Sequence, residues 1–349
     1  MKSSMYSWLW RLFGVVIVVG ALVYIFGFSP LVASEYHSVL AERFIPLPSL
    51  NKADYDARVL ALAHVSTTTY AVSSSTLPWP VKTIYPDVGA LLPFNRIVAY
   101  YGNFYSAGMG VLGEYPPNQV LAMLASTSAQ WAAADPTTPV LPAIQYIAVV
   151  AQASPGLEHN YILRMPDDQI DHALDLANQA HGILILDVQV GESTLQHELP
   201  MLEKYLQMPQ VHLAIDPEFS MKYGNPPGTV IGTFDASDIN YAAQYLASIV
   251  DTYHLPPKIL IVHRFTQDMV TNYKRIQPLP EVQIVMDMDG WGAQAKKINT
   301  YQRVIEAEPV QFTGIKLFYK NDLKPPSTGM LTTTQVLGLT PAPIYIQYQ

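Results

Sequence analysis

Several apolar runs of the sequence end in polar side chains that are spaced two residues apart. In a β-strand, residues two apart point to the same side, so each pair would project from one face. Carboxyl groups that crowd together raise one another's pKa, which lets one donate a proton near neutral pH while another stays ionised. Two such groups on either side of a sugar linkage are the machinery of glycoside hydrolysis. The pairs are Asp187 and Gln189, Asp216 and Glu218, and Asp287 and Asp289.

Other polar residues end the remaining apolar runs. A strand that is buried on both faces should be apolar throughout, so these polar residues need an explanation. His263 and Lys316 are cations that could hold neighbouring acids in the charged form. A single Asp at a strand end is also a common helix cap or turn former, and that reading stays open for each acid taken alone. We expect the following residues to bind substrate: Tyr101, Asn103, Gln145, Asp187, Gln189, His263, Asp289, Trp291, Lys316 and Gln347.

The elements that must position these residues are eight short β-rich runs with helical patterns between them. The order strand, helix, strand, helix predicts a parallel sheet. The runs begin at Arg96, Val140, Gly182, Val211, Lys258, Val282, Phe312 and Pro343. Residues 96–349 match the roughly 250 residues of a (β/α)8 TIM-type barrel, whose catalytic groups lie at the carboxyl ends of its strands. An open doubly wound sheet is the rival, but no run is followed by a G-x-G-x-x-G turn.

The helices between the runs have recognisable starts. Pro117, Pro166 with the acids after it, and Asp235 each suit the first turn of a helix. Because the chain stops on its eighth run, the closing helix of a full barrel is missing. A helical pattern at residues 51–64 is expected to cover that side of the barrel.

The chain before the barrel divides into two parts. Residues 12–34 form a run of 23 without a charge, long enough to cross a hydrocarbon core of about 30 Å. Lys2 and Arg11 precede the run, which favours a cytoplasmic N-terminus and an extracytoplasmic barrel. A cleavable signal peptide or a buried helix is the alternative. Residues 1–34 are thus predicted to be a cytoplasmic tip and membrane anchor, and residues 35–95 a juxtamembrane helix, a Ser/Thr-rich linker and a strap.

Composition narrows the range of partners. The formal net charge is -8 with no basic block, which argues against binding to nucleic acid. The sequence has no Cys, so a disulfide, a thiolate metal site and a Cys nucleophile are all excluded. No cofactor is expected.

Aromatic residues are frequent near the strand ends, where their rings would stack on sugars or simply pack at the rim. They are Tyr100, Tyr101, Phe104, Tyr105, Tyr146, Phe219, Tyr223, Trp291, Phe318 and Tyr319.

Two segments carry a limited resemblance to a known family. Asp216-Pro-Glu218 and Met286-Asp287 resemble the fourth and sixth strand ends of family 18 chitinases and related glycosidases. The resemblance implies that Glu218 is the general acid, that Asp216 orients the reacting group and that Asp287 lines the same subsite. The sequence departs from that family at Ala214 and His212, where its acidic run would continue, at Met286 in place of a Tyr, and at the end of the eighth strand, which lacks a Trp.

Three further segments, AYYGN from Ala99, GMGVLG from Gly108 and GWG from Gly290, resemble parts of uncharacterised bacterial membrane-anchored barrel proteins. That resemblance implies no activity.

The sequence therefore predicts a membrane-anchored, glycosidase-like barrel that acts on a polysaccharide of the cell envelope or the environment. One alternative is a barrel that binds glycans or serves as an envelope scaffold without catalysis. A second is a metal-dependent hydrolase, although only His263 among the histidines closes a strand; Mg²⁺ or Ca²⁺ among the acids would need no His. A Ser hydrolase is disfavoured because G-x-S-x-G is absent. The separation of the two carboxyl groups would discriminate a retaining from an inverting glycosidase.

Overall fold

The structure is a computed structural model that describes residues 49–66, 68–70 and 77–349. Ser49–Gln349 belong to one unit of the chain. The predicted membrane segment, residues 12–34, lies outside the described residues. Among the residues that are described, no helix combines the length and the apolar character needed to cross a membrane.

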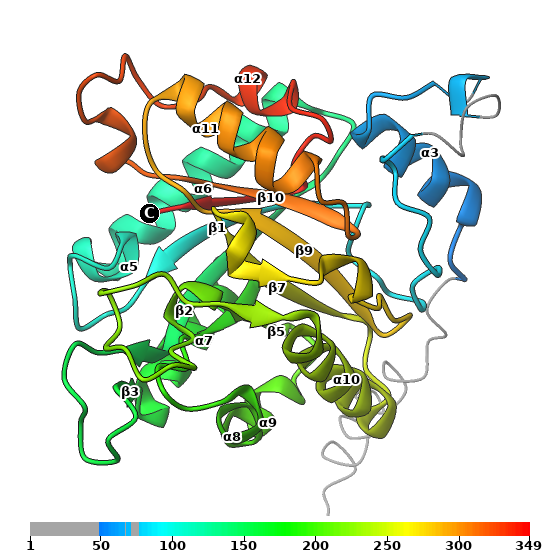
Figure 1. Cartoon of the computed structure of the whole chain (residues 1–349). Coiled ribbons are helices and arrows are strands. Elements are labelled where there is room, and N and C mark those ends of the chain that lie inside the picture. Colours follow the sequence, from blue (N-terminus) through cyan, green and yellow to red (C-terminus); the bar gives the residue numbers. More distant parts are fainter. Residues whose placement is uncertain (1–48, 67, 71–76) are drawn as a thin grey trace, which may run out of the picture. The chain divides into compact units, whose positions relative to one another are not determined.

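All eight predicted strands are present, and they form a closed parallel barrel (Figure 1). Each barrel strand pairs in parallel with the next one in the chain, and the last strand pairs in parallel with the first, which closes the ring. The open-sheet alternative is therefore wrong. The barrel strands are β1 (Arg96–Gly102), β2 (Val140–Ala151), β4 (Ile183–Val188), β5 (Val211–Ile215), β7 (Lys258–Arg264), β9 (Val282–Met288), β10 (Phe312–Leu317) and β11 (Tyr345–Tyr348).

Helices surround the barrel and begin where the sequence predicts. α6 starts at Pro117, α7 directly after Pro166, and α10 has Asp235 as its N-cap in a capping box with Asp238. The helices are α3 (Lys52–Leu62), α5 (Val111–Glu114), α6 (Pro117–Ala134), α7 (Asp167–Gln179), α8 (Leu195–Glu198), α9 (Glu203–Leu206), α10 (Ala236–Tyr253), α11 (Gln294–Tyr301) and α12 (Thr333–Leu337).

Short elements complete the unit. β3 (Ile162–Arg164) extends β2 as an antiparallel strand, and β6 (Phe234–Asp235) pairs with β8 (Val270–Thr271) outside the barrel. The single-turn helix η2 (Pro217–Phe219) directly follows β5. A π-helical turn, η5 (Gln302–Glu306), continues α11.

The alternation of side chains along each strand divides the core into two clusters. Outward side chains pack against the surrounding helices, and this larger cluster includes Val98, Leu124 and Leu246. Inward side chains form a smaller cluster inside the lower half of the barrel, which includes Ile97 and Ile261. The half of the interior nearer the carboxyl ends of the strands is polar. Apolar packing therefore stabilises the barrel from the half nearer the N-terminal ends of the strands and from its outer side.

The helix α3 covers the N-terminal end of the barrel, which corrects the expectation that it covers the side beside the last strand. In Figure 1 it lies at the opposite end of the barrel from the C-terminus. Tyr55 of α3 belongs to the inward cluster, and Leu62 accepts a hydrogen bond from the amide of Ala342. The side beside β11 is covered instead by α6, where Trp131 Nε1 donates to the hydroxyl of Tyr348 at 3.0 Å.

The strap before β1 also takes part in this closure. The buried Gln283 side chain both accepts from Leu92 N, at 3.0 Å, and donates to Leu92 O, at 2.6 Å. A polar side chain inside the lower barrel is thereby satisfied by the main chain of the strap. With this end closed, the carboxyl ends of the strands are left as the open end of the barrel.

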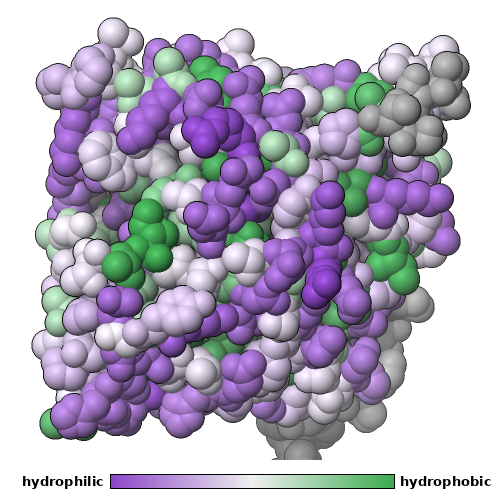
Figure 2. Space-filling model, in the orientation of Figure 1, coloured by the Kyte–Doolittle hydropathy of each residue, from purple (hydrophilic) through white to green (hydrophobic). Residues whose placement is uncertain are grey.

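The outer surface carries no large apolar area on the side of view of Figure 1. Figure 2 shows a mostly hydrophilic face on which hydrophobic side chains form small, separate patches. Small, separate patches of that kind are ordinary on the surface of a folded protein.

Candidate active site

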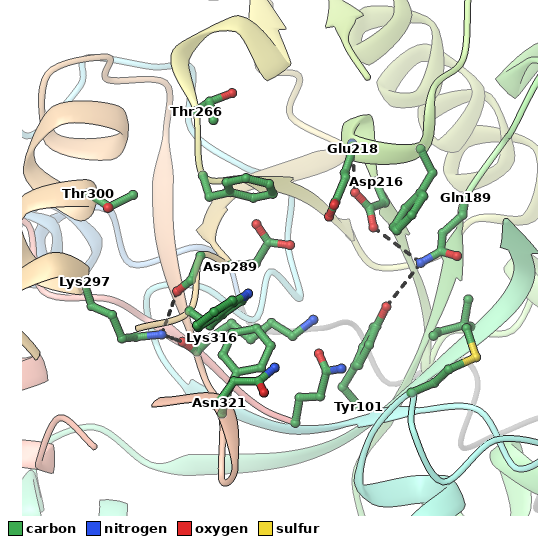
Figure 3. Close-up of a pocket in the computed structure, with 18 of the residues that line it drawn as sticks. Tyr101, Gln189, Asp216, Glu218, Thr266, Asp289, Lys297, Thr300, Lys316 and Asn321 are labelled. Atoms are coloured by element: carbon green, nitrogen blue, oxygen red, sulfur yellow. Dashed lines mark hydrogen bonds between the residues drawn. The ribbon is translucent and has the colours of Figure 1, made fainter. Parts of the chain in front are cut away.

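A cavity of about 610 Å³ lies at the carboxyl ends of the strands (Figure 3). Its size is within the range of pockets that bind small molecules. Its polar lining residues come mostly from β4, β5, β9, β10 and the segments that follow them. The lining is Tyr101, Gly108, Met109, Ile147, Gln189, Asp216, Glu218, Phe219, Phe265, Thr266, Asp289, Gly290, Trp291, Lys296, Lys297, Thr300, Lys316, Phe318, Asn321 and Gln349.

Three carboxyl groups meet in this cavity: Asp216, Glu218 and Asp289. One oxygen from each lies within 4.8 Å of the others. Asp216 follows β5 and caps η2, because its Oδ1 accepts from Glu218 N at 3.0 Å. That cap fixes the turn on which Glu218 stands. Figure 3 shows Asp216 and Glu218 on one side of the cavity and Asp289 on the other.

Burial and mutual repulsion raise the pKa of all three groups. Desolvation, followed by repulsion from Asp289, raises the pKa of Glu218 to about 7. Desolvation also raises the pKa of Asp216 well above its ordinary value, although the nearby His263 opposes this. The pKa of Asp289 is raised by burial too, while His263 and Lys316 favour its ionised form. The site thus holds a proton donor near neutral pH beside a carboxyl group that cations help to ionise.

Lys316 brings a cation to the same cavity. Its side chain is 4% exposed, and its Nζ lies 3.7 Å from the centre of the Tyr101 ring. The hydroxyl of Tyr101 faces Gln189 Nε2 at 3.5 Å, and Gln189 Nε2 also faces Asp216 Oδ2 at 3.4 Å. A chain of polar side chains therefore runs along the floor from Lys316 to the acids.

One layer deeper, a buried histidine lies between two carboxylates. His263 Nε2 is 2.9 Å from Asp187 Oδ2, and its Nδ1 is 3.1 Å from Asp287 Oδ2 and 3.6 Å from Asp289 Oδ2. Burial alone would lower the pKa of His263, but electrostatic attraction from Asp187 and the hydrogen bonds to Asp187 and Asp287 raise it well above its ordinary value. An imidazolium with both N–H groups bonded to carboxylates thus supports the cavity floor.

Amide and phenol groups extend this buried network. Gln145 Nε2 donates to Asp187 Oδ2 at 2.6 Å, and the hydroxyl of Tyr345 donates to Gln145 Oε1. Gln347 Nε2 donates to the Tyr345 hydroxyl at 3.0 Å. These side chains fix the orientation of Asp187 and so of the imidazole ring.

A lysine on α11 ties the two strand ends that carry Asp289 and Lys316. Lys297 Nζ donates to the main-chain oxygens of Gly290, at 2.8 Å, and Lys316, at 2.6 Å, and pairs with Asp322 Oδ2 at 3.1 Å. Asp322 in turn accepts from the amide of Gly292 at 2.9 Å. All three donors of the buried ammonium group are used, which holds the ends of β9 and β10 together.

The structure separates the predicted site residues into two layers. The cavity is lined by Tyr101, Gln189, Asp216, Glu218, Asp289, Trp291 and Lys316. Gln145, Asp187, His263, Asp287 and Gln347 are buried beneath it. The expectation that Asp287 lines the subsite of Glu218 is therefore corrected: Asp287 bonds to His263, and Asp289, one pleat further along, takes the place beside Glu218.

Asn103 and several aromatic residues also lie elsewhere than expected. Asn103 is buried and donates to the main-chain oxygen of Ile147 at 3.0 Å, so it shapes the loop after β1 and does not line the cavity. Tyr100 and Tyr146 point outward from the barrel into the helix layer. Of the predicted rim aromatics, Tyr101, Phe219, Trp291 and Phe318 line the cavity.

Some lining residues were not singled out from the sequence. Phe265 lies two residues beyond His263, so the alternation of the strand carried a signal for it. Lys297 carried none, because a lysine within an amphipathic helix is normally exposed. Thr266, Thr300 and Asn321 are loop or helix residues whose approach to the cavity depends on how β7, α11 and β10 are arranged in space.

The three carboxyl groups of the cavity are also the group of residues that could hold a metal ion, since each offers one oxygen within 4.8 Å of the others. Hard cations such as Mg²⁺ or Ca²⁺ prefer such ligands. No histidine belongs to this group. The raised pKa values and the nearby ammonium of Lys316 both work against a divalent cation there.

Comparison with known proteins gives a weak likeness of fold. No family model and no curated protein matches the chain. Among solved structures it is similar to a hyperthermophilic endo-β-1,4-glucanase, with a TM-score of 0.39, 11% identity, and coverage of 73% of this chain and 88% of that one.

Two further structures show a similar likeness. They are the cellulose synthase subunit Z of Clostridioides difficile, with a TM-score of 0.35, 10% identity, and coverage of 73% of this chain and 91% of that one, and an endoglucanase of an uncultured bovine rumen ciliate, with a TM-score of 0.32, 10% identity, and coverage of 59% and 72%. These resemblances do not point to family 18 in particular. They assign no role to any residue.

Proposed function

We propose that the protein is a glycoside hydrolase in which Glu218 donates the proton. The observation that carries this proposal is the pair Glu218 and Asp289, whose nearest oxygens lie within 4.8 Å of each other in a cavity of about 610 Å³. A proton donor must still hold its proton at the working pH, and the pKa of Glu218 is raised to about 7 by burial and by Asp289.

The reaction follows from this geometry. Glu218 transfers its proton to the glycosidic oxygen as the bond from that oxygen to the anomeric carbon breaks, and the Asp289 carboxylate attacks the anomeric carbon. Water then attacks the same carbon, Glu218 takes a proton from the water, and Asp289 leaves. A short separation of carboxyl groups, about 5–5.5 Å, is typical of such retaining enzymes. Asp216, held by the amide of Glu218, orients the donor.

The location is a separate proposal that rests on the sequence. The uncharged run of residues 12–34 would anchor the protein in a membrane, with the barrel on the extracytoplasmic side. A polysaccharide of the cell envelope or the surroundings would then be within reach of the cavity. Protease protection of the full-length chain in sealed vesicles, read with an antibody to the barrel, tests this orientation.

The activity is tested with the full-length protein and a panel of polysaccharides, by release of reducing ends. Glu218→Gln is expected to lower kcat by about 10²- to 10⁴-fold, the usual contribution of a general acid. Asp289→Asn is expected to lose activity as well, and the exposed Glu192→Gln serves as the control.

An activated substrate distinguishes the two roles. A dinitrophenyl glycoside has a leaving group that needs no proton, so Glu218→Gln should form its glycosyl-enzyme while Asp289→Asn should not. If both variants keep full activity, the assignment of the site is wrong. If the panel binds without any hydrolysis, the protein is a glycan-binding barrel.

A further inference from the structure

Lys316 is a buried cation that makes no direct ion pair within the described structure, although it favours the ionised form of Asp289 in the same cavity. Its ammonium group has three donors, yet no hydrogen bond or ion pair among the described residues includes it. Its contacts there are the faces of Tyr101, at 3.7 Å, and Phe318, at 5.2 Å from the ring centres. Figure 3 shows the side chain reaching into the cavity. A desolvated ammonium normally acquires an anion or several acceptors, because burial of an unpaired charge is costly.

Two more lysines stand at the rim on the same side of the cavity. Lys296 Nζ lies 5.1 Å and Lys324 Nζ 5.2 Å from the centre of the Trp291 ring, which is 48% exposed. Both lysines are exposed, and neither takes part in an ion pair within the part of the chain that the structure describes. The wall built by β10 and by the segments after β9 and β10 therefore carries three lysines that form no ion pair among the described residues.

Of the acids near this wall, Asp289 can offset one cation, because Lys316 favours its ionised form, and the others are paired elsewhere. Asp322 is bound to Lys297, and Glu308 is paired with Arg264 on the outside of the barrel. Across the cavity, Asp216 and Glu218 have raised pKa values, so much of their negative charge is absent below neutral pH. A chain with a net charge of -8 thus presents a cationic wall in this cavity. The contrast with the rest of the molecule indicates selection by charge.

We infer that the ligand of this cavity is an acidic glycan, with one anionic group bound by Lys316 and further negative charge bound by Lys296 and Lys324 at the rim. This inference rests on the proposed function for the glycan and goes beyond it in naming the substrate class. The anionic group is a carboxylate, as in a uronic acid, or a phosphate ester, since an ammonium group binds either as a point charge. Trp291 and Tyr101 supply apolar ring faces beside these cations.

The test is a binding measurement that needs no turnover. Full-length Glu218→Gln is titrated with polyglucuronate, polygalacturonate and alginate, each beside its own carboxyl-reduced, neutral form, and with a glycerol-phosphate teichoic acid. We expect one acidic polymer to bind at least tenfold more tightly than its neutral form, with an affinity that falls as salt is added. Whether a uronate polymer or the teichoic acid is preferred identifies the anionic group.

Lysine variants then locate the charge selectivity. In the Glu218→Gln background, Lys316→Met is expected to lower affinity for the acidic polymer at least tenfold and to leave affinity for neutral glycans unchanged. Lys296→Gln with Lys324→Gln should weaken binding and reduce its dependence on salt. Lys82→Met, at the N-terminal end of the barrel, is the matched control and should change nothing.

Two results would overturn the inference. One is equal affinity for acidic and neutral polymers across the panel. The other is an equal loss of both affinities in Lys316→Met, which would make Lys316 a support for the acids alone. Hydrolysis of a neutral glycan without charge selectivity would overturn the inference and leave the proposed function intact. Charge-selective binding without hydrolysis by the unmutated protein would support the inference and overturn the proposed function.

Discussion

His263 Nε2 lies 2.9 Å from Asp187 Oδ2, and both side chains are fully enclosed by the barrel. Neither residue lines the cavity. Their role is electrostatic, because the imidazolium of His263 lies directly beneath the cavity. It is bonded to Asp187 and Asp287, and its positive charge partly opposes the rise in the pKa of Asp216 and Glu218.

His263→Gln should therefore shift the pH dependence of activity toward higher pH. Loss of the imidazolium raises the pKa of Asp216, Glu218 and Asp289. Glu218 then keeps its proton up to a higher pH, and Asp289 needs a higher pH to ionise. The measurement is kcat/KM against pH for the full-length protein, with the exposed His197→Gln as control. An unchanged profile with uniformly lower activity would mean that His263 acts through packing alone.

Glu218→Gln should stabilise the protein at pH 8. The pKa of Glu218 is about 7 in the folded protein and about 4.3 in an unfolded chain, so its contribution to stability is present below the lower value and is lost as pH rises to the higher one. The glutamine variant lacks this loss, and we expect it to be more stable than the unmutated protein by about 2–3 kcal/mol at pH 8. Near pH 4 the difference should vanish.

Chemical unfolding at the two pH values measures this difference, with Glu192→Gln as the exposed control. A variant that gains nothing on going from pH 4 to pH 8 would show that Glu218 titrates as an ordinary surface acid.

Gly314→Ala should destabilise the barrel by about 1–3 kcal/mol, the usual cost of an overpacked core. A Cβ at this position would lie 2.7 Å from Asp287 Oδ1 and 2.7 Å from Tyr345 Cδ1. Neither side chain can easily move away, because Asp287 Oδ2 is bonded to His263 and the Tyr345 hydroxyl to Gln145. Denaturant unfolding gives the free energy. Gly108→Ala is a suitable control, since its Cβ would meet Ser106 Oγ at 3.7 Å. Equal stability of the two variants would indicate that the floor yields easily.

Removal of divalent cations should leave activity within about twofold. The carboxyl groups that could hold an ion have raised pKa values, and the ammonium of Lys316 lies in the same cavity. Dialysis of the full-length protein against EDTA, followed by addition of Mg²⁺, Ca²⁺, Mn²⁺ or Zn²⁺, tests this expectation. Loss of activity on dialysis and its return with one ion would favour a metal-dependent hydrolase.

The barrel itself could be predicted from the sequence. Runs such as those from Val211 and Lys258 are apolar on both faces, and their regular spacing leaves few arrangements other than a parallel ring. The position of α3 could not be predicted in this way. Tyr55 reaches the inward cluster from an earlier part of the chain, and that contact depends on the path of residues that no periodicity specifies.

The sequence did not predict which polar side chains line the cavity and which are buried beneath it. Alternation correctly placed Asp287 and Asp289 on one side of β9, but it does not tell which of two inward residues stands above the floor. That depends on the stagger of neighbouring strands, seen where Gly314 pairs with Asp287 and Lys316 with Gln347. For Asn103 the decisive factor was the fold of the loop, in which its side chain bonds to main chain.

The hydrogen bonds of Lys297 fix the spacing of two strand ends in the cavity wall. One ammonium group joins the main chain just beyond Asp289 to the main chain of Lys316, so the two strand ends cannot move apart independently. A ligand that touches both side chains must therefore match the spacing of the two strand ends, within the reach of the lysine side chain. The spacing of charge along a ligand, and not only its presence, then becomes a property that this fold measures.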